Sequence, residues 1–462
     1  MMTTEKTWLE SLRQLLKEDQ VSTGHSVLEA HSKGESFYGS KMPDAVVFPE
    51  STEDVQKVMR FAYEREIPVT PVAVNSSLEG HTVPLKGGIS LDVTRMDRIV
   101  DTRPEDLLIV VQPAVTYPQV NEQVGRSGLF FPVDPGAHAS IGGMIATNAS
   151  GTAAVRYGVT GDYVLGLEVV TPTGEVIRTG SRARKSSSGY NLTRLFCGSE
   201  GTLGVITEVT LRLTGLPEAA RAARVPFKDY VAATEFVTSI IQAGIPVARC
   251  ELVDPRSIAA VNAHQGTSYP EEITVFLEFH GNPQGLEVDA ELAESLAEDF
   301  GAVAFESSSD ADERKKLWDA RHSLYYALVA ANPGKDSINT DVTVPISKLP
   351  EAVMQALEHC TELGLSTYVV GHVGDGNFHL AIFYDAADPD MASRIEQVSH
   401  KLIMNALALG GTSTGEHGVG IRKLKYMQDE HGAALDVMRS IKQTLDPKGI
   451  MNPGKKLPEV GV

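Results

Sequence analysis

The stretch VDPGAHASIGGMIATNASGTAAVRYG, residues 133–158, decides the fold of this chain. Two further loops have the same small and polar composition, VNSSLEGH at 74–81 and GSEGTLG at 198–204. Such loops expose backbone N–H groups that bind phosphate oxygens, and they let a flat ring lie against the main chain. Their number favours a large nucleotide such as FAD, with plain turns as the alternative. A Rossmann site is not supported, because no GxGxxG sequence follows a strand and opens a helix.

The sequence around these loops alternates short helices with strands. A helix should begin after Ser51, which has a capping side chain, and a strand should follow from Ile67. Further strands and a hairpin are expected at 87–93, at 107–115 and around Gly174. This mixture over residues 45–215 indicates an α+β domain.

From about residue 220 the pattern changes to longer helices that alternate with apolar strands. Helical spacing predicts helices at 287–301, 311–328, 348–364 and 394–409. Strands are expected at 273–279 and 340–346, and a hairpin at 366–385. The pattern indicates a second domain in which helices cover a sheet. A last helix should end at Asp446-Pro447.

The segment GHVGDGNFH, residues 371–379, carries two histidines on either side of a turn. Asp375-Gly376 is typical of a two-residue type I′ hairpin loop, which would place His372 directly opposite His379. Side chains paired in this way have Cβ atoms roughly 5 Å apart, which suits two nitrogens on one metal ion. A pair of hydrogen-bonded core histidines is the alternative.

A second motif, GGTSTGEHGVG at 410–420, adds a carboxylate and a third imidazole. Adjacent residues in extended backbone point to opposite sides, so Glu416 could bind a metal while His417 faces a substrate. Two histidines and one carboxylate are a common ligand set for a catalytic divalent ion. The alternative is a local capping role for Glu416 and a solvated His417.

Composition narrows the class of protein. The net charge of −19 argues against nucleic acid as a partner, because phosphate binding needs clustered Lys and Arg. Three cysteines without CxxC spacing fit a reducing compartment, and no apolar run is long enough for a membrane span. The start of the chain is expected to be an amphipathic helix, not a signal peptide. We therefore expect a cytoplasmic protein.

Six motifs occur together and in order, namely VDPGAHASIGGMIATNASG, AVRYG, GYNLTRLFCGSEGTLGVIT, HVGDGNFH, TGEHGVG and MNPGK. In these motifs the chain resembles flavoproteins of the vanillyl-alcohol-oxidase superfamily. Within it, the match is to the family of cytochrome-type D-lactate dehydrogenases, glycolate oxidase catalytic subunits and D-2-hydroxyglutarate dehydrogenases. The resemblance implies an α+β fold with a PCMH-type FAD-binding domain and a ferredoxin-like α+β cap. The expected parts are a helical leader at 1–44, the FAD-binding domain at 45–218, the cap with the metal site at 219–424, and a segment at 425–462 that returns to the FAD domain.

The resemblance also implies roles for particular residues. It implies FAD contacts by Asn75, Ser76, Ser77, Leu78, Gly80, Pro132, Asp134, Gly136, Ser140, Gly142, Gly143, Asn148, Gly151, Tyr157, Gly158, Ile206 and Asn452. A divalent metal, Zn or Mn, would be held by His372, His379 and Glu416. His417 would be the general base, Arg321 would hold the substrate carboxylate, and Asn377 would lie at the substrate.

Three positions depart from the family pattern. Ala73 and Asn75 stand where the phosphate loop usually has glycines, and Ala73 would weaken FAD binding if that position needs a positive φ. Asn339 stands where hydroxyglutarate-type members carry a lysine for a second carboxylate. A small 2-hydroxy monocarboxylate is therefore the expected substrate.

The sequence thus predicts an FAD-dependent dehydrogenase that oxidises a D-2-hydroxy acid, with D-lactate as the first candidate. The metal and His417 would assist deprotonation of the hydroxyl, and the hydride would pass to the flavin. The electrons would then go to a quinone, a cytochrome or an electron-transfer protein. A homodimer is possible. A glycolate oxidase catalytic subunit is the first alternative. A flavin-free metal-dependent hydrolase and a non-catalytic partner subunit are alternatives from other classes.

Overall fold

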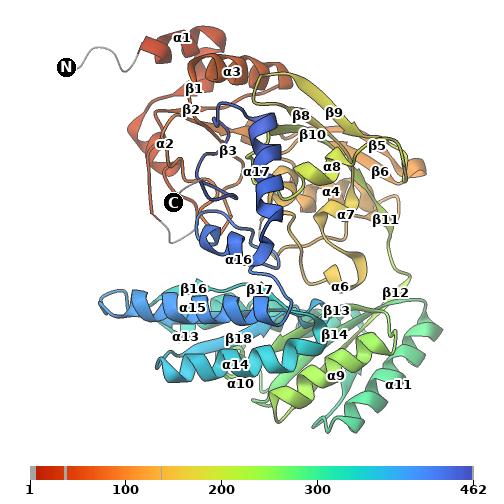
Figure 1. Ribbon diagram of the computed structural model, residues 1–462. Helices are drawn as coiled ribbons and strands as arrows, with labels where there is room; N and C mark the ends of the chain where they lie inside the picture. Colours follow the sequence, from red (N-terminus) through yellow and green to blue (C-terminus); the bar gives the residue numbers. More distant parts are fainter. Residues whose placement is uncertain (1–6, 36–38, 137, 460–462) are drawn as a thin grey trace. The chain divides into compact units, whose positions relative to one another are not determined.

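The computed structural model describes residues 7–35, 39–136 and 138–459. The chain divides into two compact units (Figure 1). The first unit consists of Met1–Ser150, Val159–Leu216 and Glu416–Val462, and the second of Gly151–Gly158 and Pro217–Gly415.

The boundaries of the two units differ from the expected ones at two places. The chain re-enters the first unit at Glu416, not at residue 425, because the carboxylate of Glu200 accepts the backbone N–H groups of Val419 and Gly420. Residues 151–158 belong to the second unit, where the hydroxyl of Tyr157 lies 2.9 Å from Nδ1 of His280.

The first unit begins with a small sheet of order β1-β2-β4-β3. Its strands are β1 (Val21–Ser22), β2 (Ala45–Val47), β3 (Val69–Val72) and β4 (Ile89–Asp92). Helices α1 (Thr7–Leu15) and α3 (Thr52–Arg65) pack against each other on this part of the unit (Figure 1). Leu9 and Leu12 are buried in the same core as the sheet, so the described part of the leader is integral to the unit. Residues 1–6 lie outside the described residues.

The capping prediction for α3 is confirmed. The Ser51 hydroxyl accepts the backbone N–H of Asp54, and α3 buries Val55, Val58 and Met59 at helical spacing. The αL residue Glu66 ends the helix, and β3 follows after Ile67 as expected. Loss of the Ser51 cap would cost about 1 kcal/mol of stability.

A five-stranded antiparallel sheet of order β5-β6-β10-β8-β9 forms the rest of the first unit's β-structure, together with the pair β7 and β11. Its strands are β5 (Ile99–Arg103), β6 (Leu108–Val111), β8 (Val164–Val170), β9 (Val176–Gly180) and β10 (Val205–Arg212); the pair is β7 (Leu129–Phe130) and β11 (Thr214–Gly215). The expected hairpin at Gly174 joins β8 to β9, with Gly174 at φ 79. The helices are α2 (His25–Ala30), α4 (Tyr117–Gly125), α5 (Ile141–Thr147), α7 (Thr160–Tyr163), α8 (Leu192–Phe196), α16 (Met427–His431) and α17 (Ala434–Leu445). The last of these ends before Asp446-Pro447, as expected.

The second unit is built on an eight-stranded antiparallel sheet. Its strands are β12 (Ala219–Phe227), β13 (Val247–Val253), β14 (Ile273–Gly281), β15 (Glu306–Ser308), β16 (Asp336–Asn339), β17 (Val342–Thr343), β18 (Thr367–Gly371) and β19 (Asn377–Tyr384). The first four strands of this unit stand in the order β15-β12-β14-β13. Numbered along the chain this is 4-1-3-2 with antiparallel neighbours, the arrangement of a ferredoxin-like sheet.

Helices cover both faces of this sheet. Helices α9 (Tyr230–Gln242), α11 (Pro283–Asp299), α14 (Leu349–Glu362) and α15 (Met391–Ala408) pack in a row (Figure 1). Helices α10 (Pro255–Gln265), α12 (Ala311–His322) and α13 (Leu324–Ala331) share a core with Val253 and Phe276, and α6 (Ala154–Tyr157) packs on β13. Since strand residues alternate between faces, Glu251 lies on the same face as Val253, beneath α12. The expected helix at 311–328 is interrupted at Ser323.

Among the described residues, none of the helices combines the length and apolar character needed to cross a membrane.

Candidate functional site

A cavity in the first unit gathers the three glycine-rich loops. It is lined by residues of 71–82, of 135–150 and of 199–206, together with Glu416, His417 and Asn452. Nine of the expected FAD contacts line it, namely Asn75, Ser76, Ser77, Leu78, Ser140, Gly142, Gly143, Ile206 and Asn452. Exposed loop backbone around one cavity is the environment that a dinucleotide requires.

Local backbone geometry explains the residue types in this cavity. Asn75 adopts φ 60, and its side chain donates to the carbonyl of Lys33 and accepts from the Thr82 hydroxyl. Ala73 has no positive φ, so an alanine at this position does not strain the phosphate loop. Gly142 admits no side chain, because a Cβ there would lie 2.6 Å from the Cβ of Pro113. Among the described residues, the buried hydroxyl of Ser77 has no hydrogen-bond partner. A ligand with phosphate oxygens therefore fits this loop.

The remaining expected FAD contacts do not line this cavity. They are Gly80, Pro132, Asp134, Gly136, Asn148, Gly151, Tyr157 and Gly158. Asn148 has a local role, since it ends α5 in the αL conformation and its side chain accepts the N–H of Gly161. Gly151, Tyr157 and Gly158 belong to the second unit.

The two histidines of GHVGDGNFH lie near each other, but not through the predicted turn. Strand β18 pairs with β19 so that Val370, not His372, stands opposite His379. A single 3-10 turn at Val373–Asp375 follows His372, and Gly376 takes φ 75. The prediction of a two-residue type I′ loop is therefore wrong. A Cβ on Gly376 would lie 2.1 Å from the carbonyl oxygen of Val344, so that backbone packs against the longer loop.

Hydrogen bonds orient both imidazoles. Nδ1 of His379 lies 2.8 Å from the carbonyl oxygen of Thr340, and Nδ1 of His372 lies 2.6 Å from Oε1 of Glu251. Because both of these partners are acceptors, each Nδ1 carries the proton. Each Nε2 then carries a lone pair, which is the form in which histidine binds a metal. The ring centroids are 5.6 Å apart.

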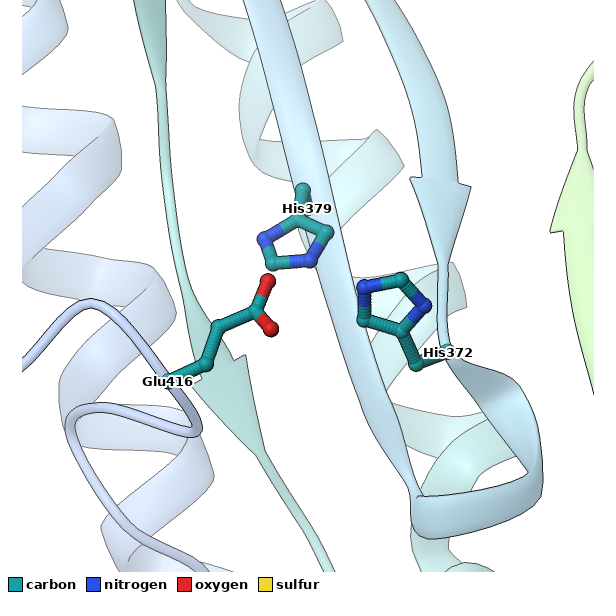
Figure 2. A group of neighbouring side chains, drawn as sticks. All are labelled: His372, His379 and Glu416. Carbon is teal, nitrogen blue, oxygen red and sulfur yellow. The ribbon is translucent and has the colours of Figure 1, made fainter. Parts of the chain in front are cut away.

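Glu416 completes a group of three possible metal ligands. One ligand atom from each of His372, His379 and Glu416 lies within 4.8 Å of the other two (Figure 2). Gly415 is held in the second unit by a hydrogen bond from its N–H to Asp341, and Glu416 follows it by one peptide bond. The local chain therefore keeps the Glu416 carboxylate beside the two histidines. The donor set suits a divalent cation such as Zn²⁺ or Mn²⁺.

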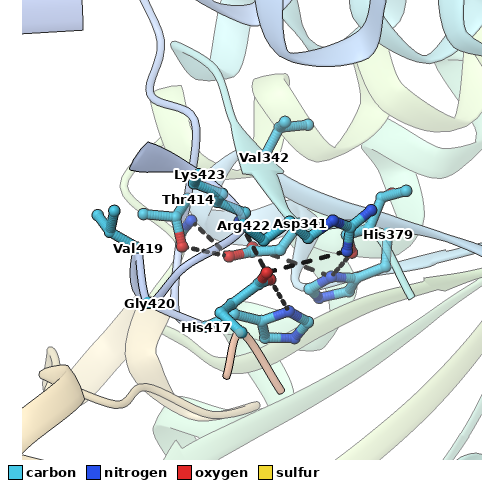
Figure 3. A network of polar contacts seen from close by, with 12 residues as sticks. Asp341, Val342, His379, Thr414, His417, Val419, Gly420, Arg422 and Lys423 are labelled. Carbon is cyan, nitrogen blue, oxygen red and sulfur yellow. Dashed lines mark hydrogen bonds and ion pairs between the residues drawn. The ribbon is translucent and has the colours of Figure 1, made fainter. Parts of the chain in front are cut away.

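Asp341 organises the loop before Glu416 (Figure 3). Its carboxylate accepts the Thr414 hydroxyl, the Gly415 N–H and the side-chain amide of Asn377. The Asn377 amide nitrogen also faces the carbonyl of Val342 and the hydroxyl of Thr343. Three acceptors around the nitrogen identify the other end as Oδ1, a buried acceptor for which the described part of the chain offers no hydrogen-bond partner. A hydroxyl group of a ligand would satisfy it.

Arg321 lies on α12 and binds Glu251, the same carboxylate that holds His372. Its Nε and Nη2 lie 3.0 and 2.8 Å from Oε2 of Glu251. Burial by itself raises the pKa of Glu251, but the interactions with His372 and Arg321 outweigh it and hold that pKa below its ordinary value. Glu251 uses one edge of the guanidinium, and the outer edge of Nη1 and Nη2 has the fork geometry that suits a carboxylate.

His417 lies in the first unit beside a second buried carboxylate. Its Nδ1 is 3.4 Å from Oε1 of Glu79, and Arg422 and Lys423 lie 3.9 and 3.6 Å from the same carboxylate. His417, Arg422 and Lys423 can be followed in Figure 3. Burial raises the pKa of Glu79, but Lys423, His417 and Arg422 lower it more, to about 2. Glu79 is therefore a fixed negative charge beside His417, which lines the cavity.

Sequence reasoning missed three carboxylates of these networks as site residues, namely Glu79, Glu251 and Asp341. One signal was present for Glu251, a charged residue within the apolar run VARCELV of β13. Lys, Glu, Arg and Asp are almost never fully buried unless they are paired. Glu79 lies in the loop at 74–81, which was predicted to bind phosphate. The residues around it are small and polar, so a charged side chain among them does not indicate burial.

Comparisons with known protein families agree with this geometry. Residues 43–180 match the FAD binding domain family, and residues 216–456 match the C-terminal domain of FAD linked oxidases. The chain is 42% identical over 451 residues to the probable mitochondrial D-lactate dehydrogenase of Danio rerio, with 97% of this chain and 91% of the relative covered. It is 40% identical over 456 residues to the mitochondrial D-lactate dehydrogenase [cytochrome] of Arabidopsis thaliana, covering 98% and 80%. The glycolate oxidase subunit GlcD of Bacillus subtilis is 35% identical over 419 residues, covering 90% and 89%.

Solved structures show the same fold at low sequence identity. p-Cresol methylhydroxylase matches with a TM-score of 0.81 at 19% identity, covering 98% of this chain and 97% of that one. A 4-ethylphenol oxidase from Gulosibacter chungangensis matches with a TM-score of 0.79 at 20% identity, over the same shares of the two chains. The expected PCMH-type fold is thereby confirmed. The chain belongs to the family of FAD-linked oxidases that includes the D-lactate dehydrogenases and the glycolate oxidase subunit above, and it is an FAD-dependent oxidoreductase.

Proposed function

We propose that this enzyme oxidises D-2-hydroxy monocarboxylates. Its preferred substrate would be D-lactate, which it would convert to pyruvate. The observation that carries the proposal is the orientation of His372 and His379. The Nδ1 atom of each ring donates a hydrogen bond to an acceptor, and both rings lie next to Glu416. Histidines held in this way by other groups are typical of metal ligands. The cation would supply Lewis acidity toward an oxygen of the substrate.

Residues of the second unit would bind the substrate at two points. The outer edge of Arg321 would accept the carboxylate in a bidentate pair. Oδ1 of Asn377 would accept the hydrogen bond of the substrate hydroxyl, which would satisfy the buried acceptor. Asn339, in place of a lysine, leaves no cation for a second carboxylate at that position. This favours a monocarboxylate over D-2-hydroxyglutarate.

His417 would take the hydroxyl proton at Nε2. Glu79 faces Nδ1, so it favours the proton on that nitrogen and leaves Nε2 as the basic atom. Imidazole titrates near neutral pH, so the same group can release the proton after each turnover. FAD, when bound, would supply the acceptor for the hydride, that is, the Cα hydrogen together with the electron pair of the broken Cα–H bond. A quinone, a cytochrome or another electron carrier would reoxidise it.

The test is anaerobic reduction of the bound flavin by three substrates at matched concentrations. We expect D-lactate to reduce the flavin fastest, glycolate more slowly, and D-2-hydroxyglutarate slowest. Glycolate in first place would support the alternative that the relative from Bacillus subtilis suggests, a glycolate oxidase subunit. No reduction by any of the three would contradict the proposal.

A homodimer and a cytoplasmic location stay predictions.

A further inference from the structure

Glu251 connects two groups for which the proposed function assigns separate tasks. It lies on β13 with its side chain fully buried, and its two oxygens serve different partners. Oε1 accepts from Nδ1 of His372 at 2.6 Å, and Oε2 accepts from Nε and Nη2 of Arg321 at 3.0 and 2.8 Å. One carboxylate thus holds both a possible metal ligand and the arginine proposed for the substrate carboxylate.

The two contacts constrain each other because they share one delocalised charge. A cation on Nε2 of His372 would make its Nδ1–H a stronger donor and draw negative charge toward Oε1. Less charge would then remain on Oε2, so the guanidinium of Arg321 would be held less tightly by Glu251. The positive charge of Arg321 would then attract an anionic ligand more strongly.

We propose that Glu251 is a positioning residue that couples cation affinity at His372 to carboxylate binding at Arg321. The inference rests on the proposed function for the identity of the cation and the substrate. By linkage, a ligand at either place changes affinity at the other by the same factor. The enzyme would therefore hold the hydroxy acid well only when the cation is present.

The chain contains a matched control in Glu278 on the neighbouring strand β14. Glu278 is also buried, and it also lies between a histidine and an arginine. His280 Nε2 is 2.7 Å and Arg249 Nε is 3.7 Å from its Oε1. His280 is not part of the group of possible metal ligands. A substitution at Glu278 removes the same kind of charge from the same sheet without touching His372.

The main variant is Glu251→Gln, which keeps the size but replaces one oxygen by an NH₂ donor. Either His372 or Arg321 must then face a donor instead of an acceptor. If it is His372, its Nδ1 becomes an acceptor and the proton moves to Nε2, the atom that would bind the cation. If it is Arg321, the guanidinium loses its hydrogen bonds to residue 251. Glu251→Gln should therefore lower Zn²⁺ or Mn²⁺ affinity by about 10 to 100-fold.

The experiment titrates chelator-treated wild type, Glu251→Gln and Glu278→Gln with Zn²⁺ or Mn²⁺ alone and measures binding by calorimetry. FAD content and melting temperature are recorded for each protein. Steady-state rates with D-lactate follow at saturating metal. Glu251→Gln should then regain much of kcat but keep a KM raised roughly tenfold, because Arg321 remains misplaced. Glu278→Gln should retain the wild-type metal affinity and KM.

Equal metal affinity in Glu251→Gln and wild type would overturn the inference, and so would an equal loss in Glu278→Gln. If Glu251→Gln does not fold, Arg321→Gln decides. Without Arg321 the charge of Glu251 concentrates on His372, so metal affinity should rise about threefold. An unchanged or reduced affinity would contradict the coupling. If wild type binds the cation but no 2-hydroxy acid reduces its flavin, the proposed function fails, while the affinity changes still decide the coupling.

Discussion

Two buried carboxylates, Glu251 in the second unit and Glu79 in the first, hold histidines in different ways. Glu251 makes short, directed hydrogen bonds of 2.6–3.0 Å to one histidine and one arginine. Glu79 lies 3.4–3.9 Å from one histidine, one arginine and one lysine. The difference indicates that Glu251 fixes which nitrogen of His372 carries the proton. Glu79 mainly supplies charge, because its contacts are longer and come from three different residues.

The largest effect should follow from removing the histidine next to Glu79. His417→Ala should slow flavin reduction by D-lactate by about 10³-fold or more, because His417 is the group proposed to take the hydroxyl proton. FAD content should stay at the wild-type level, since the loops of the cavity are intact. Stopped-flow absorbance under anaerobic conditions measures the rate. A variant that reduces its flavin at the wild-type rate would show that His417 is not the base.

Removing the charge of Glu79 should mainly affect stability. Glu79→Gln leaves Arg422 and Lys423, with side chains only 9% and 2% exposed, without their common carboxylate. Breaking a buried ion pair in this way typically costs about 3 to 5 kcal/mol. Denaturant unfolding measures the loss. The exposed Glu64 is the control, and Glu64→Gln should change stability by less than about 0.5 kcal/mol.

The same carboxylate predicts a pH dependence of stability. The pKa of Glu79 is lowered from 4.5 to about 2 in the folded protein, so the folded state favours its charged form. That contribution is complete above pH 4.5 and is lost as the pH falls toward 2. Melting temperatures of wild type should therefore drop more steeply over this range than those of Glu79→Gln. Parallel curves for the two proteins would contradict the shifted pKa.

The smallest effect is expected in the phosphate loop. Asn75 holds φ 60, a conformation that costs most residues about 1 to 2 kcal/mol. Asn75→Ala should weaken FAD binding several-fold, whereas Asn75→Gly should keep the loop geometry. Ala73→Gly should bring no gain, because Ala73 has no positive φ. FAD titration of the apoprotein compares the three. Tighter binding in Ala73→Gly would show that position 73 does limit the loop.

The sequence was informative where function depends on local patterns. Glycine-rich loops predicted a nucleotide cavity, and 74–81, 133–158 and 198–204 all contribute residues to its lining. The Ser51 cap and the Gly174 hairpin were also predictable, because turns and caps depend on neighbouring residues.

The sequence was less informative where function depends on pairs distant in the chain. Glu251 meets residues 70 and 121 positions away, and Asp341 holds a loop 73 positions away. Such contacts depend on strand order and register, which no local spacing specifies. The turn after His372 was mispredicted for a related reason. Asp375-Gly376 favours a type I′ loop locally, but the backbone at Val344 packs against a longer loop.

The most direct test of the proposed site is anaerobic flavin reduction by D-lactate in enzyme depleted of metal by chelation and then reloaded with Zn²⁺ or Mn²⁺. The FAD content of the two samples is matched before mixing. We predict that the visible flavin absorption disappears rapidly in the reloaded enzyme and only slowly in the depleted one. Full-rate reduction in the depleted enzyme, or no reduction in the reloaded one, would contradict a site in which His372, His379 and Glu416 hold a cation that the oxidation requires.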